Sequence, residues 1–259
     1  MPYAPINGID LYYESHGEGP ALVFAHGAGG NHLSWWQQVP YFSGRFRCIT
    51  FDHRAFGLSR DGEGEARLGR RMFHEDLRAL LDHLGVDDVR IVAQSMGGRT
   101  AVGFAWRNPG RVKAMVLAGT TGGAVDDDVR QLQAEHRETE EGRLPLRKRS
   151  VSPRLRERSA ALDFLYQEIN RLNPPRPRDF LAPLPGYRGS SARMLAEGGF
   201  PLLFLVGEHD AVTPPHIIER CHRAVAGSRY VVIKDSGHSA YFEQPHAFNA
   251  AVMEFLEGT

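Results

Sequence analysis

The stretch Val92-Ala93-Gln94-Ser95-Met96-Gly97-Gly98 decides the predicted fold of this chain. The β-type run from Val89 to Ala93 leads directly into Ser95, and helix-forming residues follow it. A serine held at such a strand-to-helix turn has a strained backbone, so the residues two positions away on either side need to be small. Here those residues are Ala93 and Gly97.

The usual form of this turn is G-x-S-x-G, and the chain has A-x-S-x-G, in which a methyl group still fits. The turn would place the Ser95 hydroxyl at the carboxyl end of a sheet, with the Met96 amide at a helix N-terminus directed at the same point. The alternative is a chance serine in a turn between a strand and a helix, so the rest of the chain has to decide.

The composition is that of an ordinary globular protein. The chain has 259 residues, of which 42% are apolar and 24% charged, and its formal net charge is zero. A neutral chain gives no long-range field that would favour nucleic acid or an anionic membrane. The two cysteines, Cys48 and Cys221, exclude a disulfide scaffold. Because no signal pattern and no membrane-spanning apolar run is seen, we expect a soluble, cytoplasmic protein.

Strands and helices alternate along most of the sequence. The pair Asn7-Gly8 favours a tight turn inside an N-terminal β-hairpin. Further strands are predicted at 21–25, 46–51, 89–93, 112–118, 201–206 and 230–233, with helices at 33–39, 68–84, 96–106, 215–225 and 245–256. This alternation predicts an α/β fold built from right-handed βαβ units around a mostly parallel sheet.

The pattern changes between residues 125 and 199. Apolar strands disappear, and the segment is rich in Arg, Glu and Pro, with a basic stretch from Arg143 to Arg158. We interpret residues 125–199 as a helical cap inserted over the carboxyl edge of the sheet, which divides the α/β core into residues 1–124 and 200–259. Basic runs are usually solvated helix faces, so this stretch favours such a face over an anion or nucleic-acid site.

Three side chains with complementary chemistry follow three different strands. A serine hydroxyl is a poor nucleophile near neutral pH, so it needs a neighbouring base, which in turn needs an acid to orient it. Ser95, Asp210 and His238 offer these groups. Glu208 is a competing acid, because it lies two residues before Asp210 and would point the same way in an extended strand end.

The order Ser…Asp…His along the chain is that of the α/β-hydrolases, and the sequence resembles that superfamily over essentially its whole length. The matching segments are HGAGG, DHRAFGLS, AQSMGG, VGEHD and SGHSAYFEQP, which begin at residues 26, 52, 93, 206 and 236. Ala55 departs from the family pattern, where glycine is usual, and it concerns a structural turn. The resemblance implies an α/β-hydrolase fold with a mostly parallel eight-stranded sheet flanked by helices and an inserted helical cap.

The resemblance also implies a role for each group of the triad. His238 would take the proton of Ser95 and return it to the leaving group. Asp210, which matches the family position where Glu208 does not, would fix the imidazole tautomer. The backbone amides of Ala28 and Met96 would form the oxyanion hole.

Candidates for lining the substrate pocket are Trp35, Gln94, Tyr166 and Tyr241, although aromatic residues at such positions are at least as often part of the core. No metal is expected, because His53 and His209 flank carboxylates without the spacing of a metal motif. The glycines after His26 do not form a dinucleotide fingerprint, so no cofactor is expected either.

We therefore expect a serine hydrolase that cleaves a small or medium carboxylic ester or lactone through an acyl-enzyme, similar to the carboxylesterase and enol-lactone hydrolase branches. One alternative is a carbon–carbon bond hydrolase of the meta-cleavage-product type. Such enzymes usually have Asn before the serine and Trp after the histidine, where this chain has Gln94 and Ser239. Another is a receptor-like hydrolase that mainly binds a small molecule. The expected partner is a small-molecule ester or lactone, with no nucleic acid and no membrane.

Overall fold

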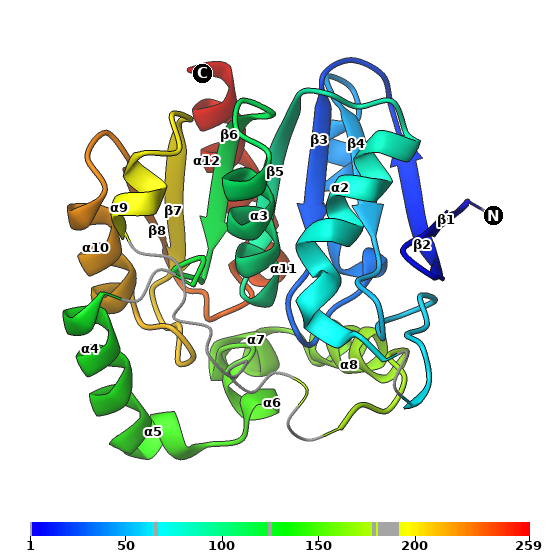
Figure 1. Ribbon diagram of the computed structural model, residues 1–259. Coiled ribbons are helices and arrows are strands. Elements are labelled where there is room, and N and C mark those ends of the chain that lie inside the picture. The colour runs from blue at the N-terminus through cyan, green and yellow to red at the C-terminus, as the bar shows by residue number, and fades with distance from the viewer. Residues whose placement is uncertain (1, 65–66, 124–125, 178–179, 181–191) are drawn as a thin grey trace.

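An eight-stranded sheet forms the centre of the computed structural model (Figure 1), which describes residues 2–64, 67–123, 126–177, 180 and 192–259. The strand order is β1-β2-β4-β3-β5-β6-β7-β8. The strands are β1 (Tyr3–Ile6), β2 (Ile9–His16), β3 (Ala21–Ala25), β4 (Arg47–Phe51), β5 (Val89–Gln94), β6 (Val112–Ala118), β7 (Leu202–Gly207) and β8 (Arg229–Ile233). β2 pairs antiparallel with β1 and β4, and the other neighbours are parallel, so the predicted fold class is confirmed.

The chain opens with the predicted hairpin. β1 and β2 are joined by Asn7 and Gly8 alone, and both residues have positive φ angles, of 47° and 76°. A two-residue turn with positive φ at both positions matches the right-handed twist of the flanking strands, and Asn-Gly tolerates that backbone best.

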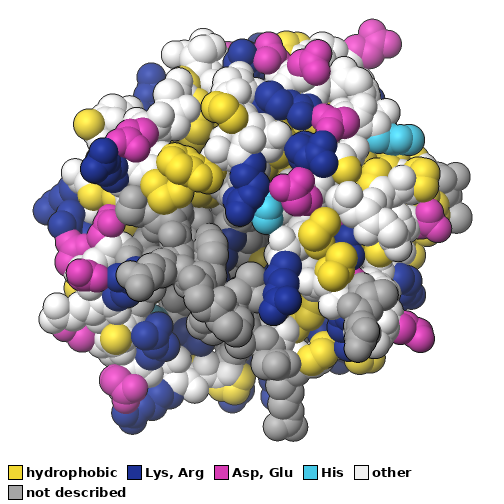
Figure 2. Space-filling model, viewed as in Figure 1, with side chains coloured by type: hydrophobic (Ala, Val, Ile, Leu, Met, Phe, Trp, Pro, Cys, Tyr) yellow, Lys and Arg dark blue, Asp and Glu magenta, His cyan; other side chains and the backbone are white. Residues whose placement is uncertain are grey.

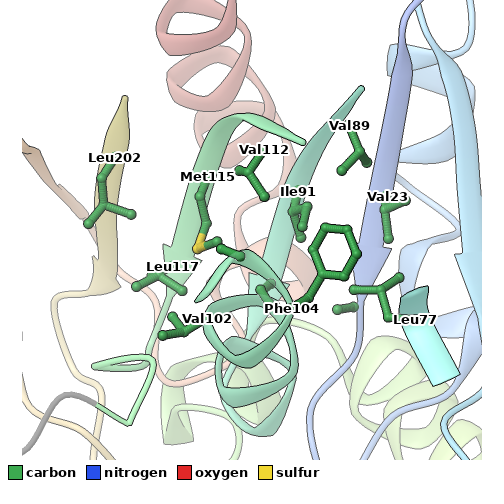
Figure 3. Packing of buried hydrophobic residues seen from close by; sticks show 14 of the residues in the cluster. Val23, Leu77, Val89, Ile91, Val102, Phe104, Val112, Met115, Leu117 and Leu202 are labelled. Carbon is green, nitrogen blue, oxygen red and sulfur yellow. The ribbon is translucent and has the colours of Figure 1, made fainter. Parts of the chain in front are cut away.

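Helices cover both faces of the sheet. On one face α2 (Phe73–His83), α3 (Met96–Arg107) and α10 (Pro215–Ala224) bury their apolar sides against the strands. Figure 3 shows Phe104 of α3 and Leu77 of α2 among the side chains of the strands β3, β5, β6 and β7. On the other face lie η1 (His32–Trp35), α1 (Val39–Phe42), α11 (Ala240–Glu243) and α12 (Pro245–Glu257). The central strands are therefore buried on both sides, as their continuous apolar sequences predict.

Two predicted helices differ in detail from the structure. The helix expected at 33–39 is two short pieces, η1 and α1, because Pro40 lacks the N–H that would continue a helix and sits instead in the first turn of α1. The helix expected at 68–84 begins as the 3₁₀ turn η3 (Gly69–Met72), where Gly69 has a φ of 56°, and becomes α2 only at Phe73.

Between β6 and β7 the chain forms a run of helices at the carboxyl edge of the sheet (Figure 1). They are α4 (Asp127–Glu138), α5 (Glu140–Arg143), α6 (Leu146–Arg149), α7 (Pro153–Arg158), α8 (Ala160–Arg171) and α9 (Ala192–Ala196). We call α4 to α8 the inserted helices. The predicted boundary between residues 124 and 125 lies outside the described residues, and the division into core and cap stays a prediction.

The surface carries charges of both signs. Figure 2 shows acidic and basic side chains interspersed on the face that it presents, in keeping with the zero net charge of the chain. Within the described ranges, we find no helix with the length and apolarity that crossing a membrane requires.

Candidate active site

A sharp turn at the end of β5 presents Ser95. Its φ of 50° and ψ of −113° lie outside the usual regions for a residue with a side chain, so the surrounding structure has to hold this backbone in place. α3 begins at the next residue, Met96. A Cβ atom at Gly97 would lie 2.2 Å from the carbonyl oxygen of Ala25, so this tight approach of α3 to β3 requires glycine.

Asp210 and His238 form a buried pair beyond the ends of β7 and β8. The Nδ1 atom of His238 lies 3.0 and 2.9 Å from the two carboxylate oxygens of Asp210. Asp210 also accepts hydrogen bonds from the backbone N–H groups of Val212 and Thr213, at 2.8 and 2.9 Å. His238 and Ser95 line the same pocket. Because Nδ1 of His238 is bonded to Asp210, its other ring nitrogen, Nε2, remains available on the side of this pocket.

Gly119 packs closely against this pair. It follows β6 with a φ of 60°, and a Cβ atom there would lie 3.0 Å from Oδ2 of Asp210 and 3.1 Å from Nδ1 of His238. Any side chain at this position would press on both groups, so the pair depends on a glycine that sequence reasoning did not identify.

The competing acid points elsewhere. Glu208 accepts hydrogen bonds from Lys234 Nζ at 2.8 Å and from the backbone N–H of Asp235 at 3.1 Å. The hydrogen bond from Lys234 is the main reason that the pKa of Glu208 is lowered. β7 ends at Gly207, so Glu208 and Asp210 lie in a turn, where the alternation of an extended strand does not apply.

The pocket over Ser95 is small. Its volume is about 10 Å³, which is room for about one water molecule. Three of the predicted lining residues, Gln94, Tyr166 and Tyr241, line it. Trp35 does not: its side chain is fully buried and packs against Phe24 and Tyr241, with ring centroids 5.1 and 4.7 Å away. An aromatic residue after a strand looks the same in sequence whether it turns toward the site or the core.

Two of the lining residues also hold the loop of His238. Gln94 donates from Nε2 to the His238 carbonyl at 3.2 Å. The hydroxyl of Tyr166, on α8, lies 3.0 Å from the Ser239 hydroxyl oxygen. These contacts join the end of β5 and one inserted helix to the same short loop.

Ala28 and Met96, the two residues predicted to form the oxyanion hole, both neighbour Ser95. Ala28 follows β3 and lines the pocket, and Met96 is the first residue of α3. Among the described residues, neither N–H donates to a protein acceptor. Two free amide donors beside a serine hydroxyl suit a developing oxyanion.

Two buried histidines brace the loop that carries Ala28. His26 Nδ1 lies 2.8 Å from the Gly27 carbonyl oxygen, and its Nε2 accepts from the backbone N–H and from Nδ1 of His53, both at 3.0 Å. His53 Nε2 in turn lies 2.9 Å from the Thr100 hydroxyl. This chain of bonds requires the His26 ring to be neutral, because its Nδ1 donates to Gly27 while its Nε2 accepts from His53. Burial lowers the pKa of His26 to about 4 and is the main cause that lowers the pKa of His53.

A buried carboxylate connects the His238 loop to the inserted helices. Glu243 accepts from the Gly237 N–H at 3.0 Å and from the N–H and hydroxyl of Ser152 at 3.1 and 2.7 Å. Burial raises the pKa of Glu243. Its only sequence signal was its place in the SGHSAYFEQP segment.

Among the described residues, one group has donor atoms close enough together to hold a metal ion. Ligand atoms of Glu208, His209 and Asp235 lie within 4.8 Å of one another at the surface. Glu208 is already paired with Lys234, and exposed carboxylates of this kind are common without an ion. His53, the other histidine considered for a metal, is committed to His26 and Thr100.

The model of the alpha/beta hydrolase fold family matches residues 20–245. The chain belongs to this family. The non-heme bromoperoxidase BpoC named in Mycobacterium tuberculosis is 31% identical over 96% of this chain and 98% of its own length. The 3-oxoadipate enol-lactonase 2 of Acinetobacter baylyi is 28% identical over 94% of this chain and 92% of its own.

Solved structures give the same result for this α/β-hydrolase. A thermophilic esterase from Thermogutta terrifontis has a TM-score of 0.75 at 26% identity, covering 96% of this chain and 94% of its own. Family members similar to this chain thus include proteins named as esterases, lactonases and bromoperoxidases, and also 2-hydroxy-6-oxononadienedioate hydrolases. The fold and family follow from these matches, and the reaction has to be argued from the site.

Proposed function

We propose that this α/β-hydrolase is a serine hydrolase that cleaves small or medium carboxylic esters or lactones. The observation that carries the proposal is the contact of His238 with Asp210, together with the pocket that His238 shares with the strained Ser95. Asp210 holds Nδ1 of the imidazole protonated, so Nε2 is free to act as a base toward Ser95. The names of an esterase and an enol-lactonase among the similar proteins support the same class of reaction.

In this mechanism Ser95 Oγ attacks the substrate carbonyl while His238 takes its proton. The carbonyl oxygen becomes an oxyanion, which the N–H groups of Ala28 and Met96 stabilise. His238 then gives the proton to the departing alcohol, and an acyl group remains on Ser95. A water molecule, activated by His238, releases the acid and restores the serine. The pocket over Ser95 has room for about one such water.

The test is hydrolysis of 4-nitrophenyl esters of graded acyl length together with labelling by a fluorophosphonate. We expect Ser95→Ala to lose labelling and to lower kcat by about 10⁴-fold or more, because the nucleophile is absent. Ser15→Ala, which removes an exposed serine on β2, is the matched control and should behave as the wild type. Labelling or turnover that persists in folded Ser95→Ala would refute the proposal.

A second candidate is carbon–carbon bond cleavage by the same triad, as the name of the 2-hydroxy-6-oxononadienedioate hydrolases among the similar proteins suggests. Gln94 and Ser239 stand where such enzymes usually carry Asn and Trp, which favours ester cleavage. Turnover of a vinylogous diketone faster than of any 4-nitrophenyl ester would reverse this preference.

A further inference from the structure

A larger chamber adjoins the small pocket over Ser95. Its volume is about 500 Å³, and it shares Ala28, Gly29, Leu146 and Ser150 with the pocket. Three arginines, Arg147, Arg171 and Arg176, line it, and the described part of the lining contains no acidic residue. Arg171 is paired with Glu168, so the positive charge of this lining comes mainly from Arg147 and Arg176, next to the pocket over Ser95.

Arg176 differs from the two exposed arginines of this chamber. Its guanidinium lies 3.9 Å from the centre of the Phe56 ring and donates to the carbonyl oxygens of Ala28, Ala55 and Pro174, at 3.2 to 3.4 Å. Among the described residues no carboxylate pairs with it. Burial removes water from the guanidinium and lowers its pKa. A cation placed in such surroundings favours an anionic partner.

Asn173 adds a buried donor that has no acceptor. Its Oδ1 accepts from the Gly57 N–H at 2.9 Å, which fixes the orientation of the side-chain amide. Its Nδ2 is buried and has no acceptor among the described residues, and Asn173 lines the same chamber. A buried amide donor without an acceptor is unfavourable, so an acceptor brought by a ligand would relieve that cost.

We propose that Arg176 and Asn173 bind a carboxylate carried by the substrate, which makes the substrate an ester or a lactone that bears a free carboxylate. This inference rests on the proposed ester hydrolysis. The guanidinium supplies charge and the amide supplies direction, at a site that meets the Ser95 pocket beside Ala28. In the reaction the ester C–O bond breaks and water supplies the new C–O bond, so a half-ester gives a dicarboxylate and an alcohol. The remote carboxylate takes no part in the bond changes.

The experiment compares pairs of substrates that differ in this charge. 4-Nitrophenyl hemiglutarate against 4-nitrophenyl valerate places the carboxylate in the acyl part, and 4-acetoxybenzoate against phenyl acetate places it in the leaving group. We expect the ratio of kcat/KM, anionic over neutral, to fall by about 10- to 100-fold in Arg176→Gln for one of the two pairs. Arg223→Gln, which removes the same charge from an exposed pair with Glu219, should leave both ratios unchanged. Unchanged ratios in Arg176→Gln would overturn the proposal.

Asn173→Asp keeps the oxygen that accepts from Gly57, removes the donor and places a negative charge in the chamber that Arg176 also lines. We expect the same ratio to fall in it. Calorimetry of glutarate with Ser95→Ala separates this site from catalysis. Heat that Arg176→Gln abolishes in the Ser95→Ala background supports the carboxylate site even if no ester is cleaved. Equal heats in the two variants overturn the site even if esters are cleaved.

Discussion

Acidification should weaken the fold through the buried histidines behind the Ala28 loop. His26 is fully buried, and its pKa is about 4 in the folded protein against an ordinary value of 6.5. The folded state then binds fewer protons than the unfolded state between these values. The stabilisation from neutral His26 is therefore complete above pH 6.5 and is lost as the pH falls toward 4.

The size of the effect follows from the two pKa values. A full shift corresponds to about 3 kcal/mol, and about 2 kcal/mol of it is lost at about pH 5. His53 acts in the same direction, since burial and the neighbouring His26 both lower its pKa. Protonation of His26 at Nε2 would also break the bond from His53 Nδ1 to that atom.

The assay is urea unfolding, followed by tryptophan fluorescence, at about pH 8 and about pH 5. The variants are His26→Asn, which keeps a donor for the Gly27 carbonyl, and His246→Asn, which removes an exposed histidine. Between the two pH values the wild type and His246→Asn should lose about 2 kcal/mol more than His26→Asn. Equal losses in all three proteins would refute the reasoning, as would an NMR titration of His26 with a midpoint near 6.5 in the folded state.

Three further predictions concern the site and its support. Asp210→Asn should lower kcat by about 10³- to 10⁴-fold in the ester assay, since it disturbs the imidazole tautomer, whereas Glu208→Gln should stay near wild type. Gly119→Ala should lower kcat in the same assay and lower the urea midpoint, because the new methyl group presses on the catalytic pair at a φ of 60°. Arg54 donates two hydrogen bonds of 2.7 Å to the buried carboxylate of Asp76. Arg54→Met should therefore lower the free energy of unfolding in urea by about 3–5 kcal/mol, because it leaves Asp76 as an unpaired buried charge.

Each of these predictions has a clear contrary result. A larger loss of kcat for Glu208→Gln than for Asp210→Asn would show that Glu208, and not Asp210, is the acid that orients His238. A Gly119→Ala protein with wild-type kcat would show that the pair does not need this glycine. For Arg54, the double variant Arg54→Met/Asp76→Leu should recover part of the lost free energy of unfolding. If it recovers none, the unpaired carboxylate of Asp76 is not the cause of the loss.

The sequence predicted those features that depend on local pattern. Alternating apolar strands and amphipathic helices are set by neighbouring residues, so the sheet and the Asn7-Gly8 hairpin follow from them. The meeting of Ser95, Asp210 and His238 follows as well, because the carboxyl ends of parallel strands share one edge of a sheet.

Other features depend on contacts between distant segments and left no local signal. The bond between His26 and His53 joins two loops, and Glu243 joins the His238 loop to Ser152 of the inserted helices. No spacing rule predicts such partners, since they are decided by how the elements pack. The core position of Trp35 has the same cause.

The attachment of α8 bears on how substrate reaches the serine. Its Tyr166 hydroxyl contacts Ser239, its Ile169 carbonyl accepts from Asn31, and the residue just beyond it, Asn173, accepts from Gly57. At about 0.5–1.5 kcal/mol for each bond, a state with α8 raised would be a minor one, roughly a per cent of molecules. Molecules with α8 in place therefore dominate the encounter with substrate, and in these molecules the chamber lies next to the small pocket over Ser95.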